Sequence, residues 1–68
     1  MGKVRPNLDV FQAEQGGKTL SVFAQELGIN AGTLSRVLTG KALPGNAFIA
    51  GAVMNLPHKF DDLFVAED

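Results

Sequence analysis

Apolar residues recur through most of the chain at spacings of three and four, the period that places them on one face of a helix. This pattern predicts five helices separated by short connections. Their expected spans are about residues 8–15, 20–27, 31–39, 47–56 and 60–66. Strict alternation of apolar and polar residues, which would indicate a strand, persists nowhere for long enough to predict one. The pattern therefore predicts an all-α domain.

Residues with distinct backbone preferences mark the ends of these helices. Thr19 and Asn30 stand immediately before the second and third helices, where their side chains can cap free N–H groups. Gly28 follows the second helix and suits the left-handed conformation of a helix end, and Gly40 ends the third helix. The second and third helices are thus expected to meet across a turn of residues 28–30.

The length of 68 residues suffices for one small domain. We expect a flexible basic arm at residues 1–6, a single domain at 7–66 and a short acidic end at 67–68. Lys3 and Arg5 of the arm could reach into a DNA groove or remain without a partner.

Charge is divided unevenly along the chain, although the net charge is only −1. Residues 1–41 carry five basic and three acidic side chains, a net charge of +2. Residues 42–68 carry one basic and four acidic side chains, a net charge of −3. The first part could face a polyanion while the second part faces away from it. The alternative is a mixed, solvated surface without a charged partner.

The longest apolar stretch, Ala47–Met54, is shorter than the roughly 18–20 residues that a membrane-spanning helix needs. The N-terminal residues also lack the pattern of a secretory signal peptide. A cytoplasmic protein is therefore expected.

The segment 20–39 meets the steric requirements of two short helices that cross around a tight turn. Ala24 is small at the point where one helix would cross the other, and Gly28 stands at the turn. Ile29 supplies an apolar side chain that fills the gap behind the turn, and no proline interrupts either helix. These features predict a helix-turn-helix motif at residues 20–39.

The stretch FAQELGINAGTLSRVLTGK, Phe23–Lys41, resembles the helix-turn-helix of the Cro/cI-type, lambda-repressor-like regulators of phages and bacteria. Two further stretches extend the resemblance to about Lys18–Val65. Pro44 and a helix from Asn46 are similar to the fourth helix of that family, and LPHKFDDLF at Leu56–Phe64 is similar to its closing element. The resemblance implies a compact bundle of five helices whose third helix enters the DNA major groove.

Carried over residue by residue, the resemblance assigns two sets of DNA contacts around the third helix, residues 31–39. The base-facing positions are Arg36, Ser35, Ala31 and Gly32. The phosphate-facing positions are Thr19, Asn30, Thr33, Thr39 and Lys41. Arg36 is the strongest candidate, because a guanidinium group can bond to both O6 and N7 of guanine. Thr19 and Asn30 have a second explanation as helix caps, which is compatible with a phosphate contact.

Family members often carry Gln, Lys, Arg or Ser where this chain has Ala31-Gly32, so the reading surface is sparse. A single subunit with few contacts would bind weakly, and we therefore expect a homodimer on a two-fold double-stranded DNA operator. One face of the fourth helix carries no charge and is formed by Ala47, Ala50, Gly51 and Met54. This face is expected either to bind a second copy or a protein partner, or to be covered by the N-terminal arm or the C-terminal end.

These observations favour a sequence-specific DNA-binding transcriptional regulator, a phage-type repressor or Cro-like protein. The alternative is a protein-interaction module, antitoxin-like or co-regulatory, that keeps the fold but binds DNA weakly or not at all. An enzyme is not expected, because cysteine and tyrosine are absent and His58 has no partners for a triad. Asp61 and Asp62 are adjacent on one helix and do not face each other as a catalytic pair would. Because the chain has one histidine and no cysteine, we expect neither a bound metal nor a cofactor.

Overall fold

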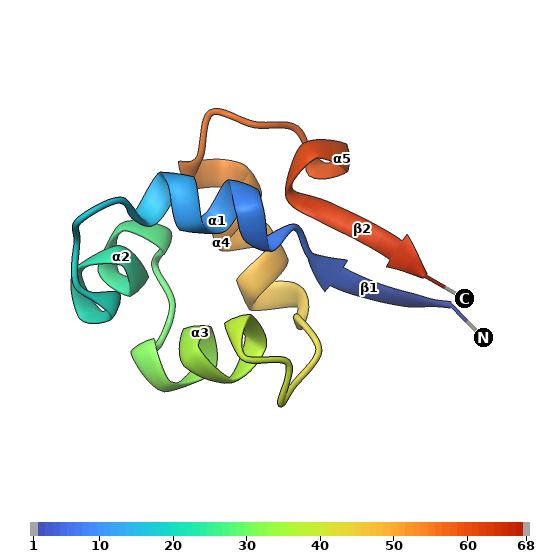
Figure 1. The fold of residues 1–68 in the computed structure, drawn as a ribbon, viewed down its shortest axis with the longest axis horizontal. Helices are drawn as coiled ribbons and strands as arrows, with labels where there is room; N and C mark the ends of the chain where they lie inside the picture. Colours follow the sequence, from blue (N-terminus) through green and yellow to red (C-terminus); the bar gives the residue numbers. More distant parts are fainter. Residues whose placement is uncertain (1, 68) are drawn as a thin grey trace.

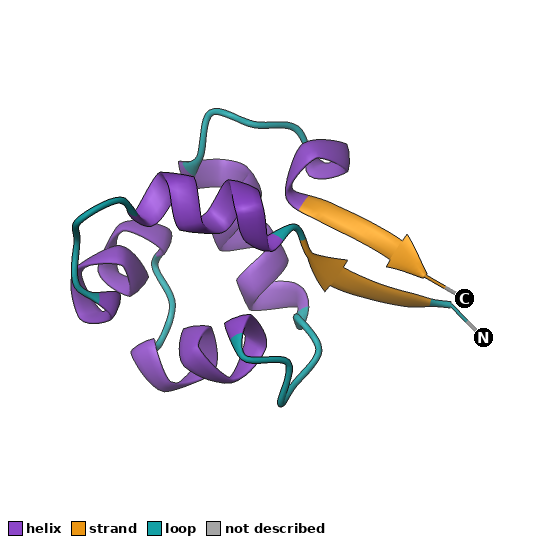
Figure 2. Cartoon of the chain, viewed as in Figure 1, coloured by secondary structure: helices purple, strands orange, loops and turns teal. Residues whose placement is uncertain are grey.

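Five helices and two short strands make up residues 2–67, the part of the chain that the computed structural model describes (Figure 1). In chain order they are β1 (Lys3–Pro6), α1 (Leu8–Gln15), α2 (Leu20–Leu27), α3 (Ala31–Leu38), α4 (Asn46–Asn55), α5 (Phe60–Leu63) and β2 (Phe64–Glu67). The four longer helices overlap the spans predicted from the apolar periodicity, which confirms those helices. The helices surround one core, and the two strands project from it as a small sheet (Figure 2).

The core forms where the apolar faces of α1 to α4 meet α5 and the first residue of β2. Its buried members are Phe11, Phe23, Ala24, Leu27, Leu34, Val37, Phe48, Ala52, Leu63 and Phe64. The ring of Phe11 lies 5.6 Å from that of Phe48 and 5.9 Å from that of Phe64, measured between centroids. Tilted and edge-to-face aromatic pairs at such separations are favourable beyond the area that they bury. The N-terminal helix and the C-terminal strand are thus joined through one aromatic cluster.

The two ends of the chain form an antiparallel two-stranded sheet, so the prediction of an all-α domain is wrong there. Residues 1–6 are predicted as a flexible arm, but residues 3–6 form β1, and Met1 lies outside the described residues. The last helix ends at Leu63 rather than near Ala66, because residues 64–67 form β2. The register pairs Lys3 with Glu67, Val4 with Ala66, Arg5 with Val65 and Pro6 with Phe64.

Tertiary contacts explain why these segments are strands. Val4 packs against the core from β1, and Phe64 is buried at the start of β2. The backbone N–H of Asn7 donates to the carbonyl oxygen of Leu63 at 2.8 Å, which extends the ladder to the start of α1. Each strand has only four residues, too few for alternation to stand out in the sequence.

The predicted acidic end at residues 67–68 is also not a separate tail. Glu67 is the last residue of β2, where it forms an ion pair with Arg5. Asp68 lies outside the described residues.

α4 is held against the turn between α2 and α3 at Gly51. A Cβ atom at this position would overlap the backbone carbonyl oxygen of Leu27 and lie 3.2 Å from Cγ2 of Ile29. The Nδ2 group of Asn55, one turn further along α4, donates to the same carbonyl oxygen at 3.3 Å. Gly51 therefore lies on the packed side of α4, and its predicted place on the open face is wrong. The other three members of that face are exposed, namely Ala47, Ala50 and Met54.

Candidate nucleic-acid interface

A tight turn joins α2 to α3, and its conformation follows from its residues. Gly28 adopts φ 71° and ψ 29°, the left-handed conformation that glycine enters without a steric cost. The backbone N–H of Ile29 donates to the carbonyl oxygen of Ala24 at 3.0 Å, so the chain leaves α2 within one turn. Ala24 is buried, and Ile29 is half-buried against the core. The turn therefore sets α2 and α3 as two crossing helices with residues 28–30 between them.

Each of these helices begins with a side-chain cap. The Oγ1 atom of Thr19 accepts the backbone N–H of Val22 at 3.2 Å at the start of α2. At the start of α3, Oδ1 of Asn30 accepts the N–H groups of Gly32 at 2.7 Å and of Thr33 at 3.3 Å. Both caps act as acceptors, so the hydroxyl hydrogen of Thr19 and the Nδ2 group of Asn30 are left as donors. Capping and a phosphate contact are chemically compatible at both predicted positions.

The outward side of α3 presents two of the four predicted base-facing residues, Gly32 and Arg36, which are exposed. Ser35 is half-buried at the edge of this side. Ala31 is half-buried and packs against the core, so its side chain is turned away from the outward side. The Nη2 group of Arg36 donates to Oγ1 of Thr33 at 3.5 Å, which directs the guanidinium group toward the start of α3.

The residues predicted to contact phosphate at the end of α3 differ in what they offer. The hydroxyl of Thr39 donates to the carbonyl oxygens of Ser35 at 2.8 Å and of Arg36 at 3.3 Å. Its hydrogen is used to close α3, and Thr39 is a poorer phosphate donor than predicted. The hydroxyl of a Thr in a helix commonly donates to the carbonyl oxygen four residues earlier, so the sequence could have predicted this bond. Lys41 is exposed just beyond the helix, and its backbone N–H donates to the carbonyl oxygen of Arg36 at 2.8 Å.

Lys18 is a cation of this region that the sequence pattern does not single out. Its Nζ atom lies 2.6 Å from Oε1 of Glu26 and 5.6 Å from the centre of the Phe23 ring. The two charged side chains are 40% and 49% exposed, so water screens the pair and weakens it. Side chains three or four residues apart meet on a helix surface, but Lys18 lies before α2 and eight residues from Glu26. The sequence spacing therefore does not predict this pair.

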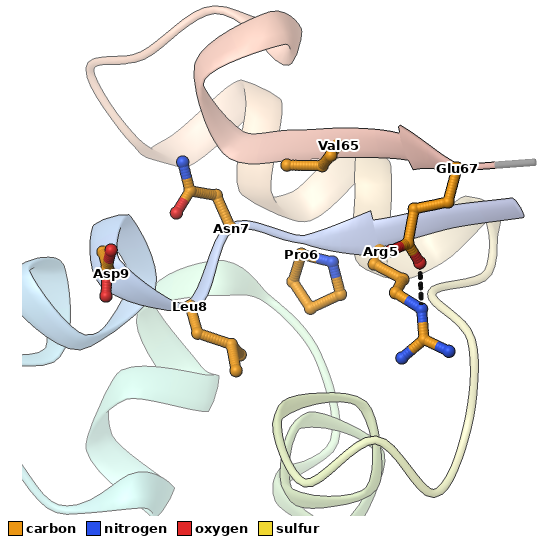
Figure 3. A pocket seen from close by; sticks show the side chains of 7 residues that line it. All are labelled: Arg5, Pro6, Asn7, Leu8, Asp9, Val65 and Glu67. Atoms are coloured by element: carbon orange, nitrogen blue, oxygen red, sulfur yellow. Dashed lines mark ion pairs between the residues drawn. The ribbon is translucent and has the colours of Figure 1, made fainter.

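β1 lies beside the C-terminal end of α3. A depression is lined by Arg5, Pro6 and Leu8 on one side and by residues 37–40 on the other. A second depression extends from the same three residues to β2 (Figure 3). Figure 3 shows the Arg5 side chain meeting that of Glu67 in an ion pair. Arg5 therefore lies beside α3 in a half-exposed, water-screened ion pair, rather than free at the end of an arm.

His58 and the acidic residues near it make tertiary and helix-start contacts. The Nε2 atom of His58 lies 3.0 Å from Oε2 of Glu14, which ties the connection between α4 and α5 to α1. The Oδ2 atom of Asp62 accepts the backbone N–H of Lys59 at 3.4 Å at the start of α5. Within residues 2–67, no group of three or more His, Cys, Asp or Glu side chains is arranged to hold a metal ion.

Comparisons of the chain with models of protein families, with curated proteins and with solved structures give no match. Across the described residues, no helix combines the length and the apolar character that crossing a bilayer requires. Function is therefore inferred from the residues and the geometry of the α2–turn–α3 unit.

Proposed function

We propose that this chain is a sequence-specific DNA-binding transcriptional regulator of the lambda-repressor-like type, a phage-type repressor or Cro-like protein. The observation that carries the proposal is the α2–turn–α3 unit. It consists of two eight-residue helices joined at a left-handed glycine, and the outward side of the second helix is open to solvent. In proteins that bind DNA with such a unit, the second helix lies in the major groove and the first crosses the backbone.

In the proposed complex, α3 enters the major groove with Gly32 and Arg36 toward the bases. Gly32 allows a close approach because it has no side chain to hold the helix away from the groove floor. Arg36 supplies hydrogen bonds to a base edge, and Ser35 adds a contact from the edge of the same side. The phosphate donors around the groove are Thr19, Asn30 and Lys41, which set the orientation of α3. Thr33, also predicted to face a phosphate, is half-buried and accepts a hydrogen bond from Arg36 instead.

One subunit offers few contacts, so the proposed regulator acts as a homodimer on a double-stranded DNA operator. α3 carries a single long polar side chain, that of Arg36, and Lys41 is the one cation among the three phosphate donors. A second subunit related by a two-fold axis doubles both sets of contacts. The two half-sites then lie about 34 Å apart, one turn of DNA.

Selection from a randomised duplex DNA library at two salt concentrations tests the proposed function. We expect enrichment of a two-fold symmetric sequence by the wild-type protein. R36A is expected to lose the preference at one base pair in each half-site, a discrimination of about 1–3 kcal/mol. Binding that is absent, or independent of sequence at both salt concentrations, would defeat the proposal.

A second candidate function, a protein-interaction module, is favoured by one surface. α4 has no charged residue, and its open face presents Ala47, Ala50 and Met54, the last of which is 82% exposed. Small residues and a flexible thioether let another helix pack closely against this face. The candidate partner is a second copy of the chain or another protein.

Met54→Glu tests this surface by placing a charge at its most exposed apolar position. M54E is expected to remain folded but to lose self-association, measured by light scattering on a sizing column. Ala13→Glu, which adds the same charge at an exposed position of α1, is the control and is expected to associate like the wild type. A wild-type chain that stays strictly monomeric at high micromolar concentration would remove the self-association version.

A further inference from the structure

We infer that Gly32 and Thr33 position the guanidinium group of Arg36, so that it reads a guanine lying toward the start of α3. This inference rests on the proposed DNA-reading function. It goes further by giving the place of that guanine along α3 and the residues that orient its reader.

Thr33 directs the guanidinium group along the helix. The bond from Nη2 of Arg36 to Oγ1 of Thr33 joins residues three apart, which are neighbours on a helix surface. Thr33 is half-buried, which limits the movement of its hydroxyl. The bond uses one N–H of Nη2 and leaves N–H groups on both terminal nitrogens. That pair can reach O6 and N7 of one guanine at the same time.

Gly32 leaves the space that this orientation needs. A Cβ atom at residue 32 would lie 3.9 Å from Nη1 of Arg36 and 3.0 Å from Oδ1 of Asn30. A longer side chain would enter the region of the guanidinium group and crowd the cap. The backbone of Gly32 is not in the left-handed region, so its conformation does not require glycine. Glycine is unfavourable in a helix, and here it leaves room beside Arg36 and Asn30 that a longer side chain would take.

The rest of α3 leaves Arg36 without a competitor for this base. Arg36 is the one charged residue of α3, and Ala31 is turned toward the core. Ser35 is half-buried and shorter, so it reaches less far into a groove. The proposed reader is therefore one guanidinium group whose place is set by its two neighbours at the start of the helix.

An operator selected by the wild-type protein and synthesised with 7-deazaguanine tests the inference. This base lacks the N7 acceptor and is placed at each guanine in turn. We expect one position in each half-site at which it weakens wild-type binding by about fivefold or more. The penalty at that position is expected to fall below about twofold in Thr33→Val and in Gly32→Leu. Thr33→Ser keeps the hydroxyl and is expected to keep the wild-type penalty.

The outcomes separate this inference from the proposed function. If the wild-type protein selects an operator but shows no 7-deazaguanine penalty, or if T33V and G32L keep the full penalty, the inference is overturned and the regulator stands. If the wild-type protein selects no sequence, the proposed function fails and the inference fails with it. Thermal melting identifies a variant that has unfolded. T33V decides the result, because a leucine at residue 32 would also hold α3 away from the groove floor. If T33V unfolds, Thr33→Ala, which also lacks the hydroxyl, replaces it.

Discussion

Gly51 lies where α4 packs against the end of α2 and the turn that follows it. A side chain here would meet the carbonyl oxygen of Leu27, a backbone atom that cannot rotate aside as a flexible side chain can. The same oxygen accepts the Nδ2 group of Asn55 at 3.3 Å. At the scale of a residue, one absent methyl group therefore sets how closely α4 supports the α2–turn–α3 unit.

Gly51→Ala is expected to lower the free energy of unfolding by about 1–3 kcal/mol, because the overlap pushes α4 away from the turn. Alanine favours a helix over glycine by about 0.5–1 kcal/mol, so a net loss would report the overlap and not helix propensity. Urea unfolding followed by circular dichroism measures the change. Gly17→Ala, in the turn after α1, is the control for an added methyl group, since a Cβ there has no neighbour within 4 Å. Equal stability of G51A and the wild type would contradict the expected overlap.

At the scale of an element, β1 and β2 depend on each other and on the core, because a strand pair of this size is barely stable alone. The bond from the N–H of Asn7 to the carbonyl oxygen of Leu63 fixes which residue pairs of the ladder are hydrogen-bonded. Hydrogen-bonded and non-bonded pairs alternate along an antiparallel ladder. Arg5 and Val65 therefore form a hydrogen-bonded pair, whereas the N–H of Ala66 points to the outer edge of the sheet.

A comparison of two proline variants tests this register. Val65→Pro removes an N–H that bonds to Arg5, and we expect it to lower the free energy of unfolding by about 1–3 kcal/mol. Ala66→Pro removes an N–H that points outward, and we expect a loss below about 1 kcal/mol. Urea unfolding of both variants measures the difference. A larger loss in A66P than in V65P would show that the register is shifted by one residue.

At the scale of the whole molecule, some acidic side chains lie far from α3 and others lie beside basic ones, as Glu67 does beside Arg5. α5, which carries Asp61 and Asp62, lies on the opposite side of the molecule from α3 (Figure 1). Glu26 lies on α2, within the proposed DNA-binding unit, and pairs with Lys18. In the proposed complex, Glu26 competes with a DNA phosphate for the ammonium group of Lys18.

Glu26→Gln is therefore expected to strengthen operator binding by about three- to tenfold at low salt. If Lys18 is released to contact a phosphate, the slope of log affinity against log salt concentration becomes steeper by about 0.9. Fluorescence anisotropy with the selected operator over a range of salt concentrations measures both effects. Asp61→Asn makes the same change in net charge on the far side and is the control, with less than about a twofold effect. Equal gains in E26Q and D61N would indicate a general charge effect rather than release of Lys18.

The sequence was sufficient for features whose causes lie close together along the chain. Periodic apolar residues predicted the four longer helices, and the caps at Thr19 and Asn30 marked where two of them begin. Gly28 marked the left-handed end of α2, because few other residues adopt that conformation without strain. The exposure of Arg36 followed from the same helical period. The DNA-binding roles of Arg36 and its neighbours stay predictions.

Only the tertiary structure decided the features that join distant parts of the chain. The pairing of Lys3 with Glu67 turns a predicted arm and a predicted helix end into a sheet. The contact between Gly51 and Leu27 moves one residue from the open face of α4 to its packed side. Local periodicity records which face of a helix is apolar, but it does not record which distant backbone groups meet. Hydrogen bonds and close contacts between such groups exist only once the chain has folded, and so the sequence pattern could not predict them.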